Sequence, residues 1–247
     1  ARSRAIDDPR REIKTLRSLV PNPNNDPGHK FIGHLVDSGT IGKDDSRSVW
    51  VATEWMDGGD MFQIIKNAGA LSPEVAVGFI RQVALAIRFI QREHNLCHLD
   101  ISLENCLVSE DMKEVRLCDF GVARTRQKAQ LMNVGPKEGY AAPEFWMRGT
   151  KVDGFAADVW SLGVCLSILL LGTPPFNRAH ESDARFEWVM EGKLDVMIHS
   201  WKADVPNVPT SLISLLQSVF TPQDQRISID DFIEALDLYS NTFTEYK

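Results

Sequence analysis

Three side chains whose oxygen atoms suit metal and phosphate chemistry lie near the middle of the sequence. Asp100 and Asn105 are five residues apart, and Asp119 follows fourteen residues after Asn105. Short apolar runs separated by polar residues predict two strands, over 105–109 and 115–118. A hairpin of these strands would bring an amide oxygen and a carboxylate to one place, which suits Mg²⁺ and phosphate oxygens.

The surrounding pattern predicts which elements must position these groups. Apolar periodicity and turn residues predict strands over 30–36 and 47–54 and helices over 8–20, 60–66 and 73–94. Ser72 followed by Pro73 is a helix-opening pair, because serine caps the first turn and proline fits the first helical position. From about residue 142 onward the pattern is mainly helical. A small strand-bearing front part therefore leads into a larger helical part.

Residues 155–171 form a nearly apolar stretch that resembles a membrane span in composition. It has only 17 residues and contains Asp158, whose charge is costly in lipid. A helix that is apolar on all sides is more typical of the buried centre of a large helical domain. We therefore expect no membrane span, and we expect backbone N–H groups of a neighbouring loop to bind the buried carboxylate.

The composition argues against a nucleic-acid-binding protein and against a secreted, disulfide-bonded one. The 247 residues carry 27 Lys and Arg against 34 Asp and Glu, a formal charge of −7, which argues against nucleic acid as the main partner. The four cysteines show no C-x-x-C spacing, and the N-terminal residues carry no apolar signal segment. These features predict an intracellular protein with reduced thiols, in the cytoplasm by default.

The motifs around these residues resemble those of eukaryotic protein kinases. His98-Leu-Asp100 with Asn105 is similar to H-R-D-x-x-x-x-N, and Asp119-Phe-Gly121 is D-F-G. Further segments match in the correct order, over roughly residues 10–238: Ala142-Pro-Glu144, Asp158-Val-Trp-Ser-Leu-Gly163, Leu171-Gly-Thr-Pro-Pro-Phe176 and Arg226, where the family has an arginine that pairs with the glutamate of A-P-E. The resemblance implies an α+β bilobal fold, with the remaining part of the N-lobe in residues 1–55 and the C-lobe in 56–247.

The resemblance also implies a role for each matching residue, with ATP and Mg²⁺ as cofactors. Asp100 would be the catalytic base that accepts or orients the substrate hydroxyl. Asn105 and Asp119 would hold Mg²⁺.

Other matching residues would surround the nucleotide. Thr53 would be the gatekeeper, Glu54 and Met56 would offer backbone groups to adenine, and Asp60 would reach the ribose or a basic substrate side chain. Two more positions complete this set: Cys118 on the floor of the nucleotide site, and Glu12 as the glutamate of the family's αC helix.

Several positions depart from the family pattern. Only eleven residues precede Glu12, too few for three strands, so the glycine-rich loop and the β3 lysine are not in this sequence. Either a front segment is missing from it, or the protein is a degenerate kinase; retention of Asp100, Asn105 and Asp119 favours the first. Leu99 replaces the arginine that meets a phosphorylated activation loop in regulated kinases.

Two further departures form a pair. Ser102 stands where Ser/Thr kinases carry a lysine that meets the γ-phosphate, and Lys137 stands where they carry a threonine. If the family geometry holds, the two face each other, so Lys137 would contact the phosphate and Asp100 while Ser102 donates the hydroxyl. The His-Leu-Asp sequence followed by a hydroxyl residue also resembles the apicomplexan FIKK kinases.

The resulting hypothesis is a kinase that phosphorylates Ser or Thr of protein substrates. Asp60, Glu104 and Glu187 match acidic positions that meet substrate arginines in basophilic kinases, so basic residues are expected near the acceptor. A pseudokinase scaffold that binds partners without catalysis is the alternative. A small-molecule phosphotransferase shares the Asp and Asn spacing, but the A-P-E motif and Arg226 belong to protein kinases.

Overall fold

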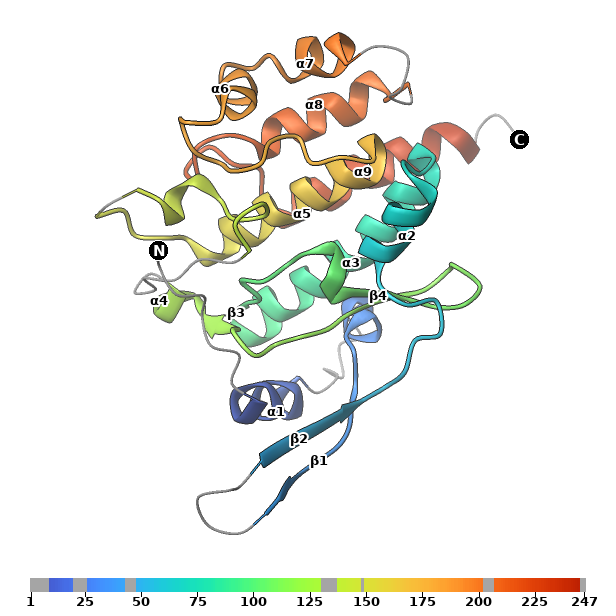
Figure 1. Cartoon of the computed structure of the whole chain (residues 1–247), viewed down its shortest axis with the longest axis vertical. Helices are drawn as coiled ribbons and strands as arrows, with labels where there is room; N and C mark the ends of the chain where they lie inside the picture. The colour runs from blue at the N-terminus through green and yellow to red at the C-terminus, as the bar shows by residue number, and fades with distance from the viewer. Residues whose placement is uncertain are drawn as a thin grey trace.

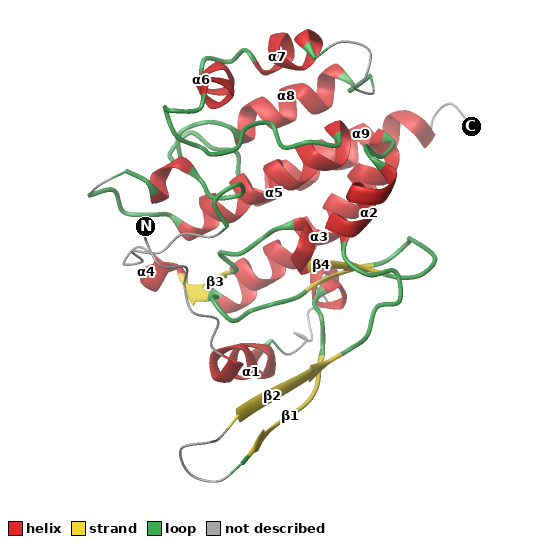
Figure 2. Cartoon of the chain, viewed as in Figure 1, coloured by secondary structure: helices red, strands yellow, loops and turns green. Residues whose placement is uncertain are grey.

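The computed structural model describes residues 9–19, 26–42, 48–129, 137–147, 149–201 and 207–244. Helix α1 (Pro9–Ser18) and strands β1 (Leu35–Ile41) and β2 (Ser48–Thr53) lie at one end of the molecule (Figure 1). At the opposite end lie the helices α6 (Ala184–Met190), α7 (Leu194–Ser200) and α8 (Thr210–Val219). Figure 2 shows the β1–β2 strands at the end that contains α1 and helices at the opposite end, as expected for an α+β fold.

The two front strands form an antiparallel hairpin. Leu35 pairs with Thr53 at one end of the register and Ile41 with Ser48 at the other. The prediction of a strand over 47–54 is confirmed, but the one over 30–36 is wrong, because residues Pro27–Phe31 form the 3₁₀ helix η1. The Asp26 side chain accepts a hydrogen bond from the Gly28 N–H at 2.8 Å, and Pro27 occupies the first helical position, so this segment turns before the strand begins.

Two short pairs of strands lie between the front part and the helical part. Strands β4 (Cys106–Val108) and β5 (Val115–Leu117) pair antiparallel, as the sequence predicted, and β3 (Leu96–Cys97) pairs with β6 (Arg124–Thr125). The Gly33 N–H donates to the Leu117 carbonyl at 2.9 Å, so the chain entering β1 is bonded to β5. Helix α4 (Arg126–Ala129) and the 3₁₀ helices η3 (Leu103–Asn105) and η4 (Pro143–Phe145) are short elements of the connecting loops.

Helices α2 (Met61–Ala68) and α3 (Pro73–His94) follow the hairpin β1–β2, and α9 (Ile229–Thr244) closes the fold against α3. The predicted start of α3 is confirmed: the Ser72 hydroxyl accepts from the Val75 N–H at 3.4 Å, and Pro73 is the first helical residue. Asn95 ends the helix with a φ of 49°, a left-handed conformation that asparagine tolerates.

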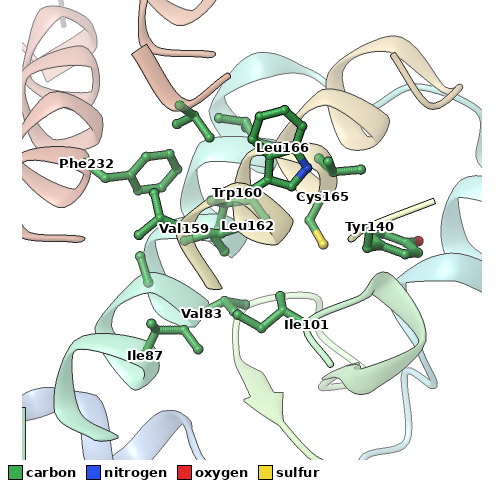
Figure 3. Close-up of a cluster of buried hydrophobic side chains, with 14 of the residues drawn as sticks. Val83, Ile87, Ile101, Tyr140, Val159, Trp160, Leu162, Cys165, Leu166 and Phe232 are labelled. Atoms are coloured by element: carbon green, nitrogen blue, oxygen red, sulfur yellow. The ribbon is translucent and has the colours of Figure 1, made fainter. Parts of the chain in front are cut away.

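Helix α5 (Gly154–Leu171) forms the centre of the core. Figure 3 shows its residues Val159, Trp160, Leu162, Cys165 and Leu166 among side chains of α3, α9 and the loops. Within the described residues, α5 is the helix that is long and apolar enough to cross a membrane, and 89% of its 18-residue window is buried inside the protein. Gly163 permits close packing of α5 on α8, because a Cβ there would lie 2.5 Å from the Val219 side chain.

Candidate active site

The loop that follows β3 is held in place by a carboxylate from the core. Asp158 of α5 is buried, and its two oxygens accept from the N–H groups of His98 and Leu99 at 2.8 Å each. Burial raises the pKa of Asp158 to about 7, an effect that the two backbone donors oppose. The expectation that backbone N–H groups bind this carboxylate is confirmed, and the loop carrying Asp100 is thereby fixed to the buried helix α5.

His98 is buried beneath this loop as a neutral imidazole. Its Nε2 lies 3.1 Å from the Cys118 carbonyl oxygen, which can only accept, while its Nδ1 accepts from the Asp100 N–H at 3.3 Å. One ring nitrogen therefore carries the proton and the other a lone pair. Burial lowers the pKa of His98 to about 4, in agreement with the neutral form. The ring also meets Phe120 edge-on, with centroids 4.8 Å apart, so His98 couples the Asp100 loop to the turn at Asp119.

The hairpin β4–β5 brings Asn105 next to the segment that contains Asp119. The Cys118 N–H donates to the Asn105 carbonyl at 2.9 Å, which continues the register of the hairpin by one pair. The Asn105 Nδ2 donates to the Asp100 carbonyl at 2.7 Å and to the Asp100 carboxylate at 3.0 Å. The structure therefore joins Asp100, Asn105 and Asp119 through Asn105, the grouping that their spacing predicted.

The oxygen atoms of Asn105 and Asp119 suit a Mg²⁺ ion that also binds phosphate groups. Because Nδ2 of Asn105 faces Asp100, its Oδ1 is turned away from Asp100 as an oxygen ligand. Asp119 has a φ of 65°, and its Oδ1 accepts from the Gly121 N–H at 3.2 Å. Among the described residues, no group of three or more His, Cys, Asp or Glu is arranged to hold a metal. Two oxygen ligands from the protein suit Mg²⁺, which takes its other ligands from phosphates and water.

The segment after β2 is bonded to the same hairpin. The Gly58 N–H donates to the Val108 carbonyl at 2.9 Å, and the Val108 N–H donates to the Gly59 carbonyl at 2.8 Å. Gly58 is required at this approach, because a Cβ would lie 2.5 Å from the Ser109 carbonyl oxygen. Thr53, which ends β2, and the following Glu54 and Met56 therefore lie on a chain segment anchored beside β4.

A side-chain ion pair that the sequence did not predict also holds this segment. Arg116 of β5 contacts the Glu54 carboxylate at 3.0 Å, and the same carboxylate accepts from the His34 N–H at 3.3 Å. Arg116 is 14% exposed, so this ion pair is better shielded from water than a surface pair. The two residues are 62 positions apart, and nothing in their spacing points to the contact.

Helix α1 lies against the turn at Asp119. Arg11 donates to the Gly121 carbonyl at 3.2 Å. Glu12, the next residue of α1, is half-buried, and its charge contributes to raising the pKa of Cys118. The structure thus brings Glu12 to the side of the site where the resemblance put it.

Lys137 and Ser102 meet across the loop. The Lys137 Nζ donates to the Ser102 hydroxyl at 2.8 Å and lies 3.4 Å from a carboxylate oxygen of Glu104. The other Glu104 oxygen accepts from the Tyr140 hydroxyl at 3.3 Å. The resemblance predicted that Lys137 and Ser102 face each other, but not that Glu104 and Tyr140 complete the network.

The three acidic residues expected near a substrate differ in their surroundings. Asp60 caps α2, because its carboxylate accepts from the Gln63 N–H at 2.9 Å. Glu104 is engaged by Lys137 and Tyr140, whereas Glu187 of α6 is exposed. Leu99 is only 3% exposed and points into the core, so it offers no contact to a phosphate on the surface.

Cys118 is bonded within the hairpin. Its thiol donates to the Asn105 carbonyl oxygen at 3.3 Å. Burial, reinforced by the charges of Asp119 and Glu12, raises the pKa of Cys118 to about 12. The thiolate, which is the reactive form, is therefore scarce at neutral pH.

We expect alkylation of Cys118 to be slow at pH 7 and to increase about tenfold per pH unit up to pH 10, since the thiolate fraction grows at that rate below the pKa. The measurement is the iodoacetamide labelling rate of the peptide containing Cys118, followed by mass spectrometry. Free cysteine labelled in the same buffers is the control, and its rate should level off above its lower pKa. A Cys118 rate that levels off with free cysteine would contradict the raised pKa.

Comparison with known proteins agrees with this geometry. Residues 4–236 match the family model described as the protein kinase domain. The chain is 34% identical over 194 residues to calcium/calmodulin-dependent protein kinase type 1 of Caenorhabditis elegans, an alignment that covers 77% of this chain and 51% of that protein. It is 33% identical over 158 residues to the SNF-related serine/threonine-protein kinase of Homo sapiens, covering 63% of this chain and 20% of that protein. The chain thus spans about half the length of the worm relative.

Proposed function

The chain belongs to the protein kinase domain family, and on that premise we propose that it transfers the γ-phosphoryl group of ATP to Ser or Thr hydroxyls of protein substrates. The observation that carries the proposal is the fixed Asp100 loop. Asp100 is bonded to Asn105 through both its carbonyl and its carboxylate, and the backbone before it is held by Asp158. The related proteins named as serine/threonine kinases support Ser and Thr as acceptors.

The chemistry assigned to Asp100 is proton acceptance. The acceptor hydroxyl oxygen forms the new bond to the γ-phosphorus, and the bond between that phosphorus and the oxygen of the leaving ADP breaks. The hydroxyl proton passes to the Asp100 carboxylate, which accepts a hydrogen bond from Asn105 and lies in a loop bonded to Asp158. Mg²⁺ held by Asn105 and Asp119 would supply positive charge beside the phosphate oxygens.

The nucleotide is proposed to lie between the β2–α2 segment and the turn at Asp119. Glu54 and Met56 would offer backbone groups to adenine, beside Thr53 as gatekeeper. The Arg116–Glu54 ion pair supports this assignment, because it ties the segment after β2 to β5, the strand that leads to Cys118 and Asp119. Asp60 would reach the ribose or a basic side chain of the substrate, and Cys118 would line the floor of the nucleotide site.

The substrate is proposed to carry arginine N-terminal to its acceptor. Asp60 and Glu187 have carboxylates whose described partners are not cations, and a guanidinium pairs with a carboxylate through two parallel hydrogen bonds. Glu104 contributes less, because Lys137 already compensates its charge at 3.4 Å.

We expect the full-length protein to phosphorylate serine and threonine peptides in the presence of Mg²⁺ and ATP, and to prefer those with arginine before the acceptor. The measurement is phosphate incorporation into a positional peptide array that includes tyrosine acceptors and arginine-to-alanine partners of each peptide. Incorporation only at tyrosine would contradict the acceptor class. Equal incorporation with and without arginine would remove the substrate preference while leaving the activity.

A further inference from the structure

Lys137 enters the site from a different part of the chain than the loop that carries Asp100. It is half-buried, with 20% of its side chain exposed, and its Nζ donates to the Ser102 hydroxyl at 2.8 Å. Ser102 is two residues after Asp100 and is fully buried. The ammonium group of Lys137 is therefore held at the base of the Asp100 loop, rather than extended into solvent as an exposed lysine would be.

The backbone of Lys137 is fixed as firmly as its side chain. Its carbonyl oxygen accepts from the N–H groups of Tyr140 at 2.9 Å and Ala141 at 3.0 Å. The Tyr140 carbonyl in turn accepts from the Ser161 hydroxyl of α5 at 2.9 Å. The cation therefore sits on a turn anchored to the same core helix that holds the Asp100 loop through Asp158.

The positive charge of Lys137 acts on a neighbouring residue of the Asp100 loop. Its charge adds to the effect of burial in lowering the pKa of His98, two residues before Asp100. His98 itself is neutral at physiological pH, so the loop residue beside Asp100 supplies no positive charge. Transfer of a phosphoryl group develops negative charge on its oxygens, and a fixed cation in a partly dry site stabilises that charge strongly.

From these contacts we infer that Lys137 is a catalytic residue, whose ammonium binds the transferring phosphoryl group while Ser102 and Glu104 hold it in place. The inference rests on the proposed function, since it assigns a role within the same reaction. Because the two side chains meet at 2.8 Å, a lysine at position 102 and a hydroxyl at position 137 would span the same gap from opposite ends and keep one cation in it. A swapped pair should therefore work where the single change does not.

The test is a set of variants of the full-length protein, assayed with a serine peptide at saturating ATP and Mg²⁺. We expect Lys137→Thr and Lys137→Gln to lower kcat by roughly 10²–10³-fold, as for loss of one preorganised charge-stabilising group. Lys137→Gln keeps hydrogen-bonding atoms toward Ser102 and Glu104 but removes the charge, so a purely structural tie would leave its kcat near wild type. The double variant Ser102→Lys/Lys137→Thr should regain at least about tenfold over Lys137→Thr, the coupling that a double-mutant cycle measures.

A binding measurement and a control variant separate failure of the Lys137 role from failure of the proposed function. Binding of ADP, Mg²⁺ and aluminium fluoride, a mimic of the transferring phosphoryl group, should weaken at least about tenfold in Lys137→Gln, while binding of ADP alone changes little. The exposed Lys151→Thr is the matched control and should retain wild-type kcat. An inactive wild-type protein overturns the proposed function and this role with it. An active wild type overturns the Lys137 role alone if Lys137→Gln is equally active, or if the double variant is no better than Lys137→Thr.

Discussion

Replacing Asp100 with asparagine should lower kcat by about 10²–10⁴-fold, the range for losing a positioned general base. Asparagine has the size of aspartate and can still accept the hydrogen bond from Asn105, but its amide takes no proton from a hydroxyl. The thermal unfolding temperature should therefore remain close to that of the wild type. The measurement is steady-state phosphorylation of a serine peptide by the full-length protein, with circular dichroism as the check on folding.

Asp195→Asn is the matched control for this substitution, because Asp195 lies exposed on α7 at the other end of the molecule. It should leave kcat unchanged. If Asp100→Asn retained more than about a tenth of wild-type kcat, the range for general bases would not apply and the role given to Asp100 would be wrong.

The second large effect concerns the ion pair between Glu144 and Arg226. Both side chains are buried, at 3% and 0% exposed, and two hydrogen bonds of 2.7 and 3.1 Å join them. Arg226→Met would leave the Glu144 carboxylate without its partner in the interior. We expect the free energy of unfolding to fall by about 3–5 kcal/mol, because an uncompensated buried charge is costly. Urea denaturation of the full-length protein measures the change.

A surface pair provides the comparison. Lys193 and Glu191 form an ion pair at 2.6 Å, but both side chains are about half exposed, at 54% and 55%. Lys193→Met should change the free energy of unfolding by no more than about 1 kcal/mol. Removing both charges of the buried pair, in Glu144→Leu/Arg226→Met, should cost less than Arg226→Met alone. Equal losses for the buried and the surface substitutions would show that burial of the Glu144–Arg226 pair does not matter.

The sequence predicted most reliably the features that depend on neighbouring residues. The start of α3 follows from Ser72 and Pro73 alone, and the β4–β5 hairpin follows from two short apolar runs with a polar turn between them. The strand predicted over 30–36 failed, because Phe31 and Ile32 look like strand residues while Asp26 and Pro27 impose a 3₁₀ turn. The register that starts β1 at Leu35 depends on Thr53, which local patterns do not reveal.

In the candidate site, too, contacts between residues far apart in the sequence could not be predicted from local patterns. The order of the motifs predicted that Asp100, Asn105 and Asp119 come together and that Ser102 faces Lys137. The Arg116–Glu54 ion pair and the bond from Tyr140 to Glu104 could not be predicted, since both join common polar residues across long stretches of chain. Shifts of pKa also depend on three-dimensional burial: the sequence shows that Cys118 precedes Asp119, but not that burial is the main cause of its raised pKa.

The most direct test of the account is transfer of radiolabel from [γ-³²P]ATP to a serine-containing protein substrate by the full-length protein, compared with its Asp119→Asn variant. Asp119 is the carboxylate assigned to Mg²⁺, and its neutral amide counterpart keeps the size of the side chain. We expect phosphoserine in the wild-type reaction and at least about a hundredfold less with the variant, since charge stabilisation at the phosphates would be lost. Absence of labelled phosphoserine in the wild-type reaction, or equal labelling by the variant, would contradict it.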